Sequence, residues 1–461
     1  MKAYVLVAGL MLAVGVLGIS PYRHTLRYHS KAIAYRVRNL FDGTEMHPAL
    51  NYALSGSNPS NNRKTVRLKV TAYYPVWMTG PYGSPIGGGW TFACPPDSID
   101  WTDIDYVVHF SDGNVMTASP WCTLLTSSSN DSIEQNFGRF GGNHYYADSL
   151  TAQVHRKGGQ VLLCVQAVNP KQLDSIASDS TKVHNMAKAF VGYVRRHNYD
   201  GLDFDYEGWQ CSVPDLNRIV RLLRVELNTL NPPGSLLVSA SMYDYDNYWP
   251  SQDNLVTLFN PQFYAYSYSW NGLEGFNGVW HVAAVDPGYV PLGFDGKCLA
   301  THGPKMWSER GHRVDKIGAG MWSGAVSYKG ADTLFVKWSD SKVNEVSYNY
   351  VRHYYLRYGG TMNYDSVRGI RYVNGKTTQD IPFNWWGAPG MASGTAFWCS
   401  YVGPETHQQW VGYLKSAGYA GIMLYDMSYD FDPDSTNGHG RLSGLEVVKT
   451  ANKNWSNSTG R

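Results

Sequence analysis

The sequence predicts a (β/α)8 barrel that carries a small α+β insertion between its seventh and eighth strands. Eight short runs are rich in β-branched and aromatic residues, and longer stretches that include helical patterns lie between them. Strands that alternate with helices are typical of a parallel sheet covered by helices. Eight such strands favour closure into a TIM barrel.

Each run has the length of a single strand. The runs cover residues 66–74, 104–110, 160–168, 201–207, 236–242, 263–270, 316–322 and 421–427. Two of the connections carry an apolar stripe at helical spacing, formed by Val183, Met186, Phe190 and Val194 in the first and by Leu216, Ile219, Val220, Leu223 and Leu227 in the second. Because such a stripe is buried against a sheet, we expect both helices to coat the barrel.

The seventh and eighth runs are too far apart for a simple crossover. The interval is rich in aromatic residues, and we expect an inserted subdomain at about residues 330–395. The catalytic domain is expected to span residues 65–445, insertion included. Residues 446–461 are polar, and we expect them to form a frayed tail.

The N-terminus carries a targeting signal. Lys2 is followed by an uninterrupted apolar or small run from Ala3 to Ile19. Its length lies between a signal-peptide core and a short membrane span, so residues 1–20 are either a signal peptide or a membrane anchor. We therefore expect a protein that is secreted, or tethered through residues 3–19 and facing outside. Residues 21–64 show no sustained period and are expected to be an irregular linker.

Composition excludes some classes of function. The 461 residues include 39 Lys and Arg against 37 Asp and Glu, so there is no global field of the kind that attracts nucleic acid. Aromatic residues make up 14%, and their flat rings suit either a large core or sugar faces. The six cysteines form no CxxC, so we expect no metal and no cofactor. Cys94 and Cys122 are the favoured disulfide pair, and we expect a monomer.

The segment YDGLDFDYEGW, residues 199–209, carries the chemistry. On a strand, Asp203, Asp205 and Glu207 share one side at a spacing of about 7 Å. Large apolar residues alternate with them, which favours burial over an exposed acidic face or a calcium loop. Three carboxylates would then project into the barrel near the C-terminal end of the strand, where barrel enzymes have their active sites. Crowding and burial raise a carboxyl pKa, so Glu207, nearest the mouth, can act as a general acid.

The same segment resembles the DGxDxDxE signature of family-18 glycoside hydrolases, the chitinase family, at Asp200, Gly201, Asp203, Asp205 and Glu207. The likeness extends over most of residues 65–440. It implies a retaining, substrate-assisted mechanism in which the 2-acetamido carbonyl of the sugar is the nucleophile. The resemblance makes Glu207 the acid and then the base. It makes Asp205 the group that holds the acetamido N–H, and Asp203 the partner that tunes Asp205.

Other positions carry over from the resemblance with departures. Tyr266 stands where the family has a tyrosine that binds the acetamido oxygen, although Ser267 replaces the acidic residue that usually follows. Tyr425 stands at the tryptophan floor beneath the bound sugar, and Gln166 at a position usually held by a small residue. Four further residues at the ends of their runs could line the cleft or merely pack there. They are Tyr73, Asp244, Trp322 and Asp426.

Three functions remain open. The first is a chitinase that acts on β-1,4-linked N-acetylglucosamine polymers, which the long insertion favours. The second is an endo-β-N-acetylglucosaminidase or a peptidoglycan-directed glucosaminidase, which the altered third and sixth strands favour. The third is a non-catalytic chitin-binding lectin, and the presence of Glu207 argues against it.

Overall fold

The computed structural model describes fourteen stretches of the chain, and all of them lie in the unit formed by residues 63–461. The stretches are residues 67–75, 96–110, 144–166, 176–206, 212–241, 247–264, 266–267, 281–284, 286, 299–333, 344–366, 369–381, 390–432 and 441–458. The expected export segment and linker, and the Cys94–Cys122 pair, lie outside them. Within them, Cys164 and Cys399 are buried free thiols, and no helix is both long and apolar enough to cross a membrane.

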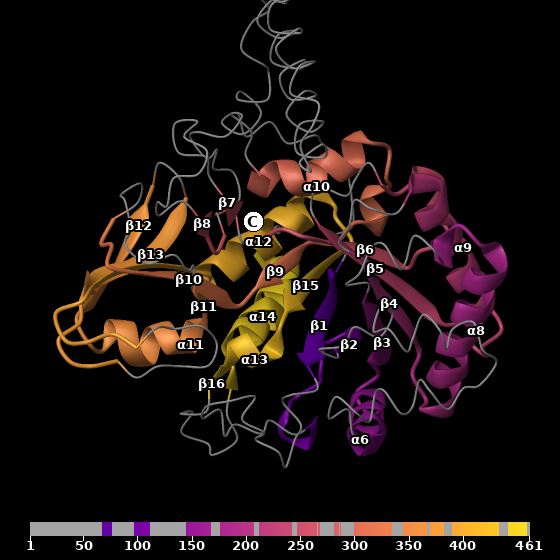
Figure 1. Ribbon diagram of the computed structural model, residues 1–461, viewed down its shortest axis with the longest axis horizontal. Coiled ribbons are helices and arrows are strands. Elements are labelled where there is room, and N and C mark those ends of the chain that lie inside the picture. The colour runs from indigo at the N-terminus through magenta and orange to yellow at the C-terminus, as the bar shows by residue number, and fades with distance from the viewer. Residues whose placement is uncertain are drawn as a thin grey trace, which may run out of the picture. The chain divides into compact units, whose positions relative to one another are not determined.

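Eight parallel strands form a closed barrel (Figure 1), which confirms the predicted fold. In order around the barrel they are β1 (Lys69–Pro75), β2 (Tyr106–Phe110), β3 (Gln160–Gln166), β4 (Gly201–Asp205), β5 (Ser235–Ser241), β6 (Leu258–Gln262), β9 (Gly320–Trp322) and β15 (Gly421–Tyr425). Strand β15 pairs with β1 and closes the ring. Because all the strands run the same way, their C-terminal ends meet at one rim.

Side chains that alternate along the strands separate two cores. One cluster includes Val108, Leu162 and Met423 and fills the inside of the barrel. The other includes Leu202 and Phe204 and packs beneath the helices. The residues of β4 therefore divide between the two layers as a period of two requires.

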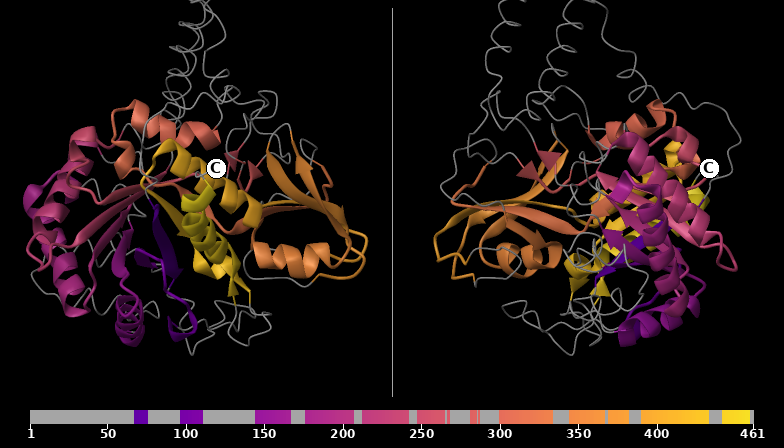
Figure 2. Two further views of the ribbon diagram at one scale, coloured as in Figure 1. Left: turned by 180° about the vertical axis from the view of Figure 1, so that it is seen from behind. Right: turned by 45° about the vertical axis from the view of Figure 1, so that its right-hand side comes forward.

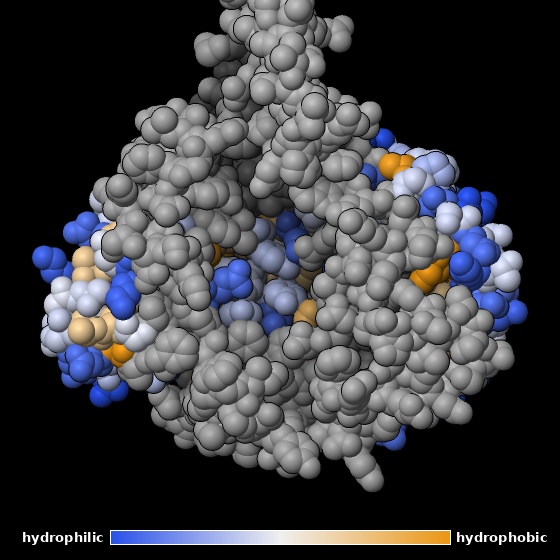
Figure 3. Space-filling view, viewed as in Figure 1, coloured by the Kyte–Doolittle hydropathy of each residue, from blue (hydrophilic) through white to orange (hydrophobic). Residues whose placement is uncertain are grey.

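Helices cover the outside of the barrel, and two of them form where the apolar stripes predicted them. They are α6 (His144–His155), α8 (Ser180–Arg196), α9 (Val213–Leu227), α10 (Leu299–Glu309), α12 (Pro404–Ala417) and α14 (Ser443–Ser458). All nine stripe residues named for α8 and α9 are buried. Asp179 and Ser212 cap the two helices by accepting hydrogen bonds from first-turn N–H groups. The described surface beside α9 in Figure 3 is mostly hydrophilic, as the outer side of such helices should be.

The sixth strand lies earlier than the sequence predicted. The barrel uses Leu258–Gln262, whereas Tyr266 and Ser267 form β7, which pairs antiparallel with β8 (His281–Val282) in a separate ribbon. Strand β6 contains Pro261, which has no N–H to donate to the ladder. The strand persists because bonds flank the proline, from Gly318 N to Phe259 O (2.7 Å) and from Phe263 N to Gly320 O (3.0 Å).

The insertion spans residues 324–401, wider than the expected 330–395. Its antiparallel sheet has the order β11-β10-β14-β13-β12. The elements are β10 (Gly324–Lys329), β11 (Asn344–Ser347), α11 (Tyr348–Tyr350), η6 (Val351–Leu356), β12 (Gly360–Asp365), β13 (Ile370–Lys376) and β14 (Ala396–Tyr401). The first and last of these strands pair with each other, which extends the subdomain at both ends. Figures 1 and 2 show the sheet on the side of the barrel opposite α8 and α9.

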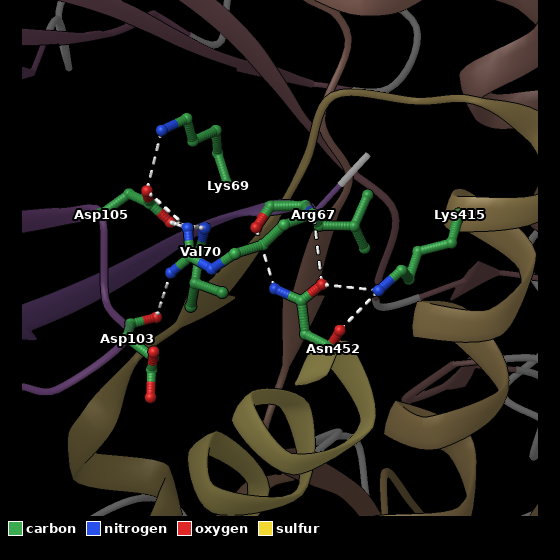
Figure 4. Close-up of polar contacts among 8 residues, drawn as sticks. Arg67, Lys69, Val70, Asp103, Asp105, Lys415 and Asn452 are labelled. Carbon is green, nitrogen blue, oxygen red and sulfur yellow. Dashed lines mark hydrogen bonds and ion pairs between the residues drawn. The ribbon is translucent and has the colours of Figure 1, made fainter. Parts of the chain in front are cut away.

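Residues 446–458, expected to be a frayed tail, belong to helix α14. The Asn452 amide donates to Leu68 O (2.9 Å), and its Oδ1 accepts from Leu68 N (3.1 Å), as a neighbouring strand would (Figure 4). Lys415 of α12 donates to Asn452 O (2.5 Å). The polar sequence concealed this packing because the side that faces the barrel is itself partly polar, with Leu445 and Val448 buried beside Asn452.

Candidate active site

Two of the three predicted carboxyls lie inside the barrel at the C-terminal end of β4. Asp203 is 0% exposed and Asp205 is 4% exposed, while Leu202 and Phe204 point into the outer layer. The predicted alternation is confirmed for these residues. Asp205 is the last residue of its strand, so the pair lies where the strand ends meet. Glu207 lies outside the described residues, and its place beside the pair stays a prediction.

The first two positions of the signature hold the other end of β4. Asp200 Oδ2 accepts from Val161 N (2.7 Å) and lies 2.7 Å from His155 Nε2, which ties the strand to β3 and α6. A Cβ on Gly201 would lie 2.0 Å from Ser235 O of β5, so only glycine fits here. These two residues therefore have structural roles that set the register of the carboxyls.

Three other strands supply hydrogen-bond partners to Asp203. The Tyr73 hydroxyl of β1 donates to Oδ2 (2.6 Å), and Ser239 Oγ of β5 donates to Oδ1 (2.8 Å). Tyr73 OH and Ser239 Oγ also contact each other. Cys164, the register neighbour of Asp203 on β3, contributes a third hydrogen bond. Both oxygens of the carboxyl are thus held by neutral donors.

Burial dominates the electrostatics of this group. It raises the pKa of Asp203 to about 6, against the lowering effect of the hydrogen bonds from Tyr73, Ser239 and Cys164. Burial, together with the negative charges of Asp203 and Asp205, raises the pKa of the Tyr73 phenol and of the Cys164 thiol well above their usual values. Tyr73 and Cys164 therefore remain protonated donors, while Asp203 titrates close to neutrality.

An aromatic cluster adjoins the carboxyl pair. Tyr425, the last residue of β15, has its ring 5.7 Å from Tyr73 and 5.4 Å from Phe110, and it is only partly buried. Tyr264 stacks on it at 5.8 Å with an interplanar angle of 10°. The structure therefore brings two predicted residues, Tyr73 and Tyr425, together with the acidic pair. A sugar-facing role for Tyr425 stays a prediction.

Trp322 and Asp426 occupy tightly packed positions. The Trp322 ring is 2% exposed, lies 5.3 Å from that of Tyr429, and is in close contact with Gly324. Asp426 accepts from Ser428 N (2.7 Å) and Tyr429 N (3.3 Å) at the start of α13 (Met427–Asp430). Burial raises the pKa of Asp426 to about 6. Packing accounts for both positions, and substrate contacts there remain predictions.

The remaining candidates are placed only in part. Tyr266 is on β7 and not on a barrel strand, which corrects its predicted element. Gln166 ends β3 in register with Asp205. Asp244 lies outside the described residues. Sequence reasoning missed Ser239 and Tyr264. Alternation along β5 places Ser239 on the inward side with Leu237, and that signal could have found it.

Buried carboxyls lie at the C-terminal end of a strand in a closed parallel barrel, which is where barrel enzymes have their active sites. The sequence matches Glycosyl hydrolases family 18 over residues 148–430, more than half of the chain. The chain therefore belongs to this family and is a glycoside hydrolase.

Solved structures share the fold. Catalytic domain 2 of the Group II chitinase of Ostrinia furnacalis is 15% identical, with a TM-score of 0.61 over 84% of this chain and 97% of that domain. The same domain, as a mutant, was solved in complex with penta-N-acetylchitooctaose. An N-acetylglucosaminidase of Paenibacillus barengoltzii is 14% identical, with a TM-score of 0.56 over 83% and 99% of the two chains.

A larger protein also contains this fold. The multi-modular, cell-surface-expressed chitinase of Paenibacillus sp. str. FPU-7 is 16% identical, with a TM-score of 0.58 over 84% of this chain. This chain spans 43% of the length of that enzyme.

Proposed function

We propose that the protein is a retaining glycoside hydrolase that cleaves β-1,4-linked N-acetylglucosamine polymers by substrate-assisted catalysis. The observation that carries this proposal is the buried pair of Asp203 and Asp205 at the end of β4, with Asp203 held by Tyr73 and Ser239. Asp203 titrates near neutrality and lies beside Asp205 on the same strand. A negative charge can therefore pass between the two carboxyls during a reaction.

The proposed steps balance without a cofactor. Glu207 gives its proton to the glycosidic oxygen as the bond from that oxygen to C1 breaks, and the acetamido carbonyl oxygen of the substrate bonds to C1. Asp205 accepts a hydrogen bond from the acetamido N–H and stabilises the positive oxazolinium ring. Water then attacks C1 as the bond from C1 to the acetamido oxygen breaks, which reopens the ring and returns the neutral acetamido group. The water gives a proton to Glu207, which restores the acid, and the two inversions at C1 retain the configuration.

Similarity supports chitin as the substrate. The neighbouring structures include chitinases, an N-acetylglucosaminidase and a complex with a chitooligosaccharide, and each shares this fold. One observation favours an endo-β-N-acetylglucosaminidase or a peptidoglycan-directed enzyme as the second candidate. Gln166 is in register with Asp205 and replaces the small residue that the family resemblance implies at this position.

One set of assays tests these candidates. Purified protein is given fluorogenic chitobiose and chitotriose substrates, a high-mannose glycoprotein and peptidoglycan, beside Glu207→Gln and the exposed control Glu309→Gln. Hydrolysis of chitooligosaccharides that falls at least about a thousandfold in Glu207→Gln alone supports the proposal. Cleavage of only the glycoprotein or peptidoglycan supports the second candidate. Binding without turnover on any substrate rejects an enzymatic role and leaves a chitin-binding lectin.

We also propose that residues 3–19 bring the domain to the outside of the cell, as a cleaved signal or as a tether. The uninterrupted apolar run supports this. Expression in a secreting host, followed by N-terminal sequencing of the medium and membrane fractions, separates the two forms. Full-length protein confined to the cytosol would reject both.

A further inference from the structure

We infer that the outer side of helices α8 and α9 is a docking surface for an anionic lipid membrane. We call this surface the basic face, and its residues are Lys188, Arg195, Arg221 and Val225. The inference rests on the proposed export of the domain and does not depend on the proposed reaction. The distribution of charge over the covering helices carries it.

That distribution is uneven. Helix α8 contains four Lys and Arg and no Asp or Glu, and α9 contains three Arg against two acids, so the pair has a net charge of +5. Among the other described helices that cover the barrel, α10 and α12 are neutral, and the one excess acid of α6 balances the one excess base of α14. The whole chain has a net charge of only +2. Positive charge is therefore concentrated on the side of the barrel opposite the insertion (Figures 1 and 2).

The acids near this side already have partners. Each of three carboxyls lies within 4.0 Å of a basic side chain, in the pairs Asp179–Lys182, Asp215–Arg218 and Glu226–His184. Arg224 is partly buried and donates to backbone carbonyls. Within the described part of the chain, Lys188, Arg195 and Arg221 are exposed and form no ion pair. Their charges are therefore available to an anionic partner.

The two helices present these side chains as one surface. Helix α8 packs against α9, and Arg195 donates to Thr229 Oγ1 just beyond the end of α9 (3.2 Å). Lys188 and Arg195 are two turns apart on α8, and Arg221 and Val225 are one turn apart on α9. The buried apolar stripes occupy the opposite sides of both helices, so these residues point outward. Val225 is 47% exposed and adds an apolar contact among the cations.

This composition fits a lipid surface better than a protein or a nucleic acid. A specific protein interface needs a centre of large apolar anchors, whereas Val225 is the one large apolar side chain exposed on the described residues of α8 and α9. Long cationic side chains around a small aliphatic group are suited to the headgroup boundary of an anionic membrane. The proposed export also places the domain away from the nucleic acids of the cell.

The N-terminal part of the sequence favours the same partner. Residues 21–64, expected to be an irregular linker, number 44. A flexible chain of this length has a root-mean-square end-to-end distance of about 35 Å. In the tethered form of the protein, the domain therefore stays close to the bilayer, and a weak contact is made at high effective concentration. Each Lys or Arg near an anionic surface strengthens binding about fivefold, and salt screens the effect.

The test is acetylation of lysines, read by mass spectrometry, on full-length protein reconstituted into vesicles. Vesicles of phosphatidylcholine are compared with vesicles that contain about 30% phosphatidylglycerol. We expect Lys188 to react at least about fivefold more slowly in the anionic vesicles and to recover its rate in about 0.5 M salt. Lys376 of β13 is the matched control, because it is exposed and lies in the insertion. Its rate should change less than about twofold between the vesicles.

Two double variants test the charges while Lys188 remains as the reporter. Arg195→Gln with Arg221→Gln removes two cations of the basic face, so the protection of Lys188 should disappear. Arg352→Gln with Arg357→Gln removes two exposed cations from η6 and its C-terminal end in the insertion. This control should leave the protection of Lys188 as it is in wild type.

The cleaved form of the protein is tested by sedimentation with the same vesicles. The Kd of the basic-face variant should be about 25-fold higher than that of wild type, and the Kd of the insertion variant within about twofold of it. Equal protection of Lys188 and Lys376, or no protection at low salt, overturns the inference. Protection of Lys188 by soluble heparin and not by vesicles also overturns it, because the partner would then be a polyanion. A protein that cleaves no glycan rejects the proposed function and leaves these measurements unchanged.

Discussion

Carboxyls lie at both ends of the barrel, but their burial and their partners differ. At the base, Asp105 accepts two hydrogen bonds from Arg67 (2.8 Å each), one from Lys69 (2.9 Å) and one from Val70 N (2.9 Å), as Figure 4 shows. At the other end, the donors to Asp203 among the described residues are the neutral groups of Tyr73, Ser239 and Cys164. Hydrogen bonds from cations to a carboxylate are charge-assisted, whereas burial among neutral donors raises the pKa of Asp203.

We use this difference to separate carboxyls that stabilise the fold from those proposed to take part in the reaction. Asp200 shares the structural pattern, because it accepts from Val161 N beside His155. Strand β4 therefore follows an acid that fixes its position and ends with the two acids for which we propose a role in the reaction. A single signature combines both, so membership in it does not by itself make a residue catalytic.

The largest effect is expected from Asp203→Asn. The amide cannot take a negative charge, so we expect kcat/KM to fall by about a hundredfold or more. The substitution should also change how the free energy of unfolding depends on pH. Wild type loses the contribution of Asp203 as pH rises through about 6, so the variant should gain unfolding free energy relative to wild type over that interval.

Steady-state kinetics and urea unfolding at pH 4.5 and 8 measure both quantities. Activity close to wild type in Asp203→Asn would contradict the assignment of this carboxyl to the chemistry. Asp205→Asn is the companion variant, because it keeps the Asp203 network and removes the neighbouring charge.

Gly201→Ala is expected to have a smaller effect, which is a loss of stability. The new Cβ would lie 2.0 Å from Ser235 O, which is backbone and cannot rotate away. Strands β4 and β5 must then separate, at a cost of about 3 kcal/mol. Thermal or urea unfolding measures this, with Gly394→Ala as a control for a glycine whose Cβ would meet nothing within 4 Å. The positive φ of Gly394 strains an alanine there, so the control variant itself loses some stability. The difference between the two variants therefore underestimates the cost at Gly201.

Sequence reasoning reached the parts of the site that depend on local periodicity. Alternation placed Asp203 and Asp205 inside, and helical stripes placed α8 and α9 outside. It failed where a residue type is unusual for the element that contains it. The sixth strand was predicted at residues 263–270, whereas the barrel uses Leu258–Gln262 with Pro261 inside it, and the polar residues around Asn452 were predicted to be a tail, whereas they belong to a docked helix.

The partners of Asp203 were beyond reach for a different reason. Tyr73, Cys164 and Ser239 come from three strands far apart in the chain, and alternation says only that each points inward. Which of them meet is decided by the tilt and stagger of the closed barrel. Ser239 is in register with Asp205 and yet donates to Asp203, so even a correct list of strand pairs would have named the wrong partner.

The smallest effect is expected from Asp105→Asn at the base of the barrel. The variant keeps one acceptor for Val70 N but loses the ion pairs with Arg67 and Lys69, whose side chains are 42% and 51% exposed. Pairs with exposed partners contribute little, so we expect the free energy of unfolding to fall by about 1 kcal/mol, and by less at high salt.

Activity per folded molecule should be unchanged in Asp105→Asn, because Asp105 precedes β2 and lies at the opposite end of the barrel from Asp205. Urea unfolding at low and high salt, with chitotriose kinetics beside it, measures both. A change in the pH profile of activity would mean that the two ends of the barrel are coupled, and the division between structural and reactive carboxyls would fail.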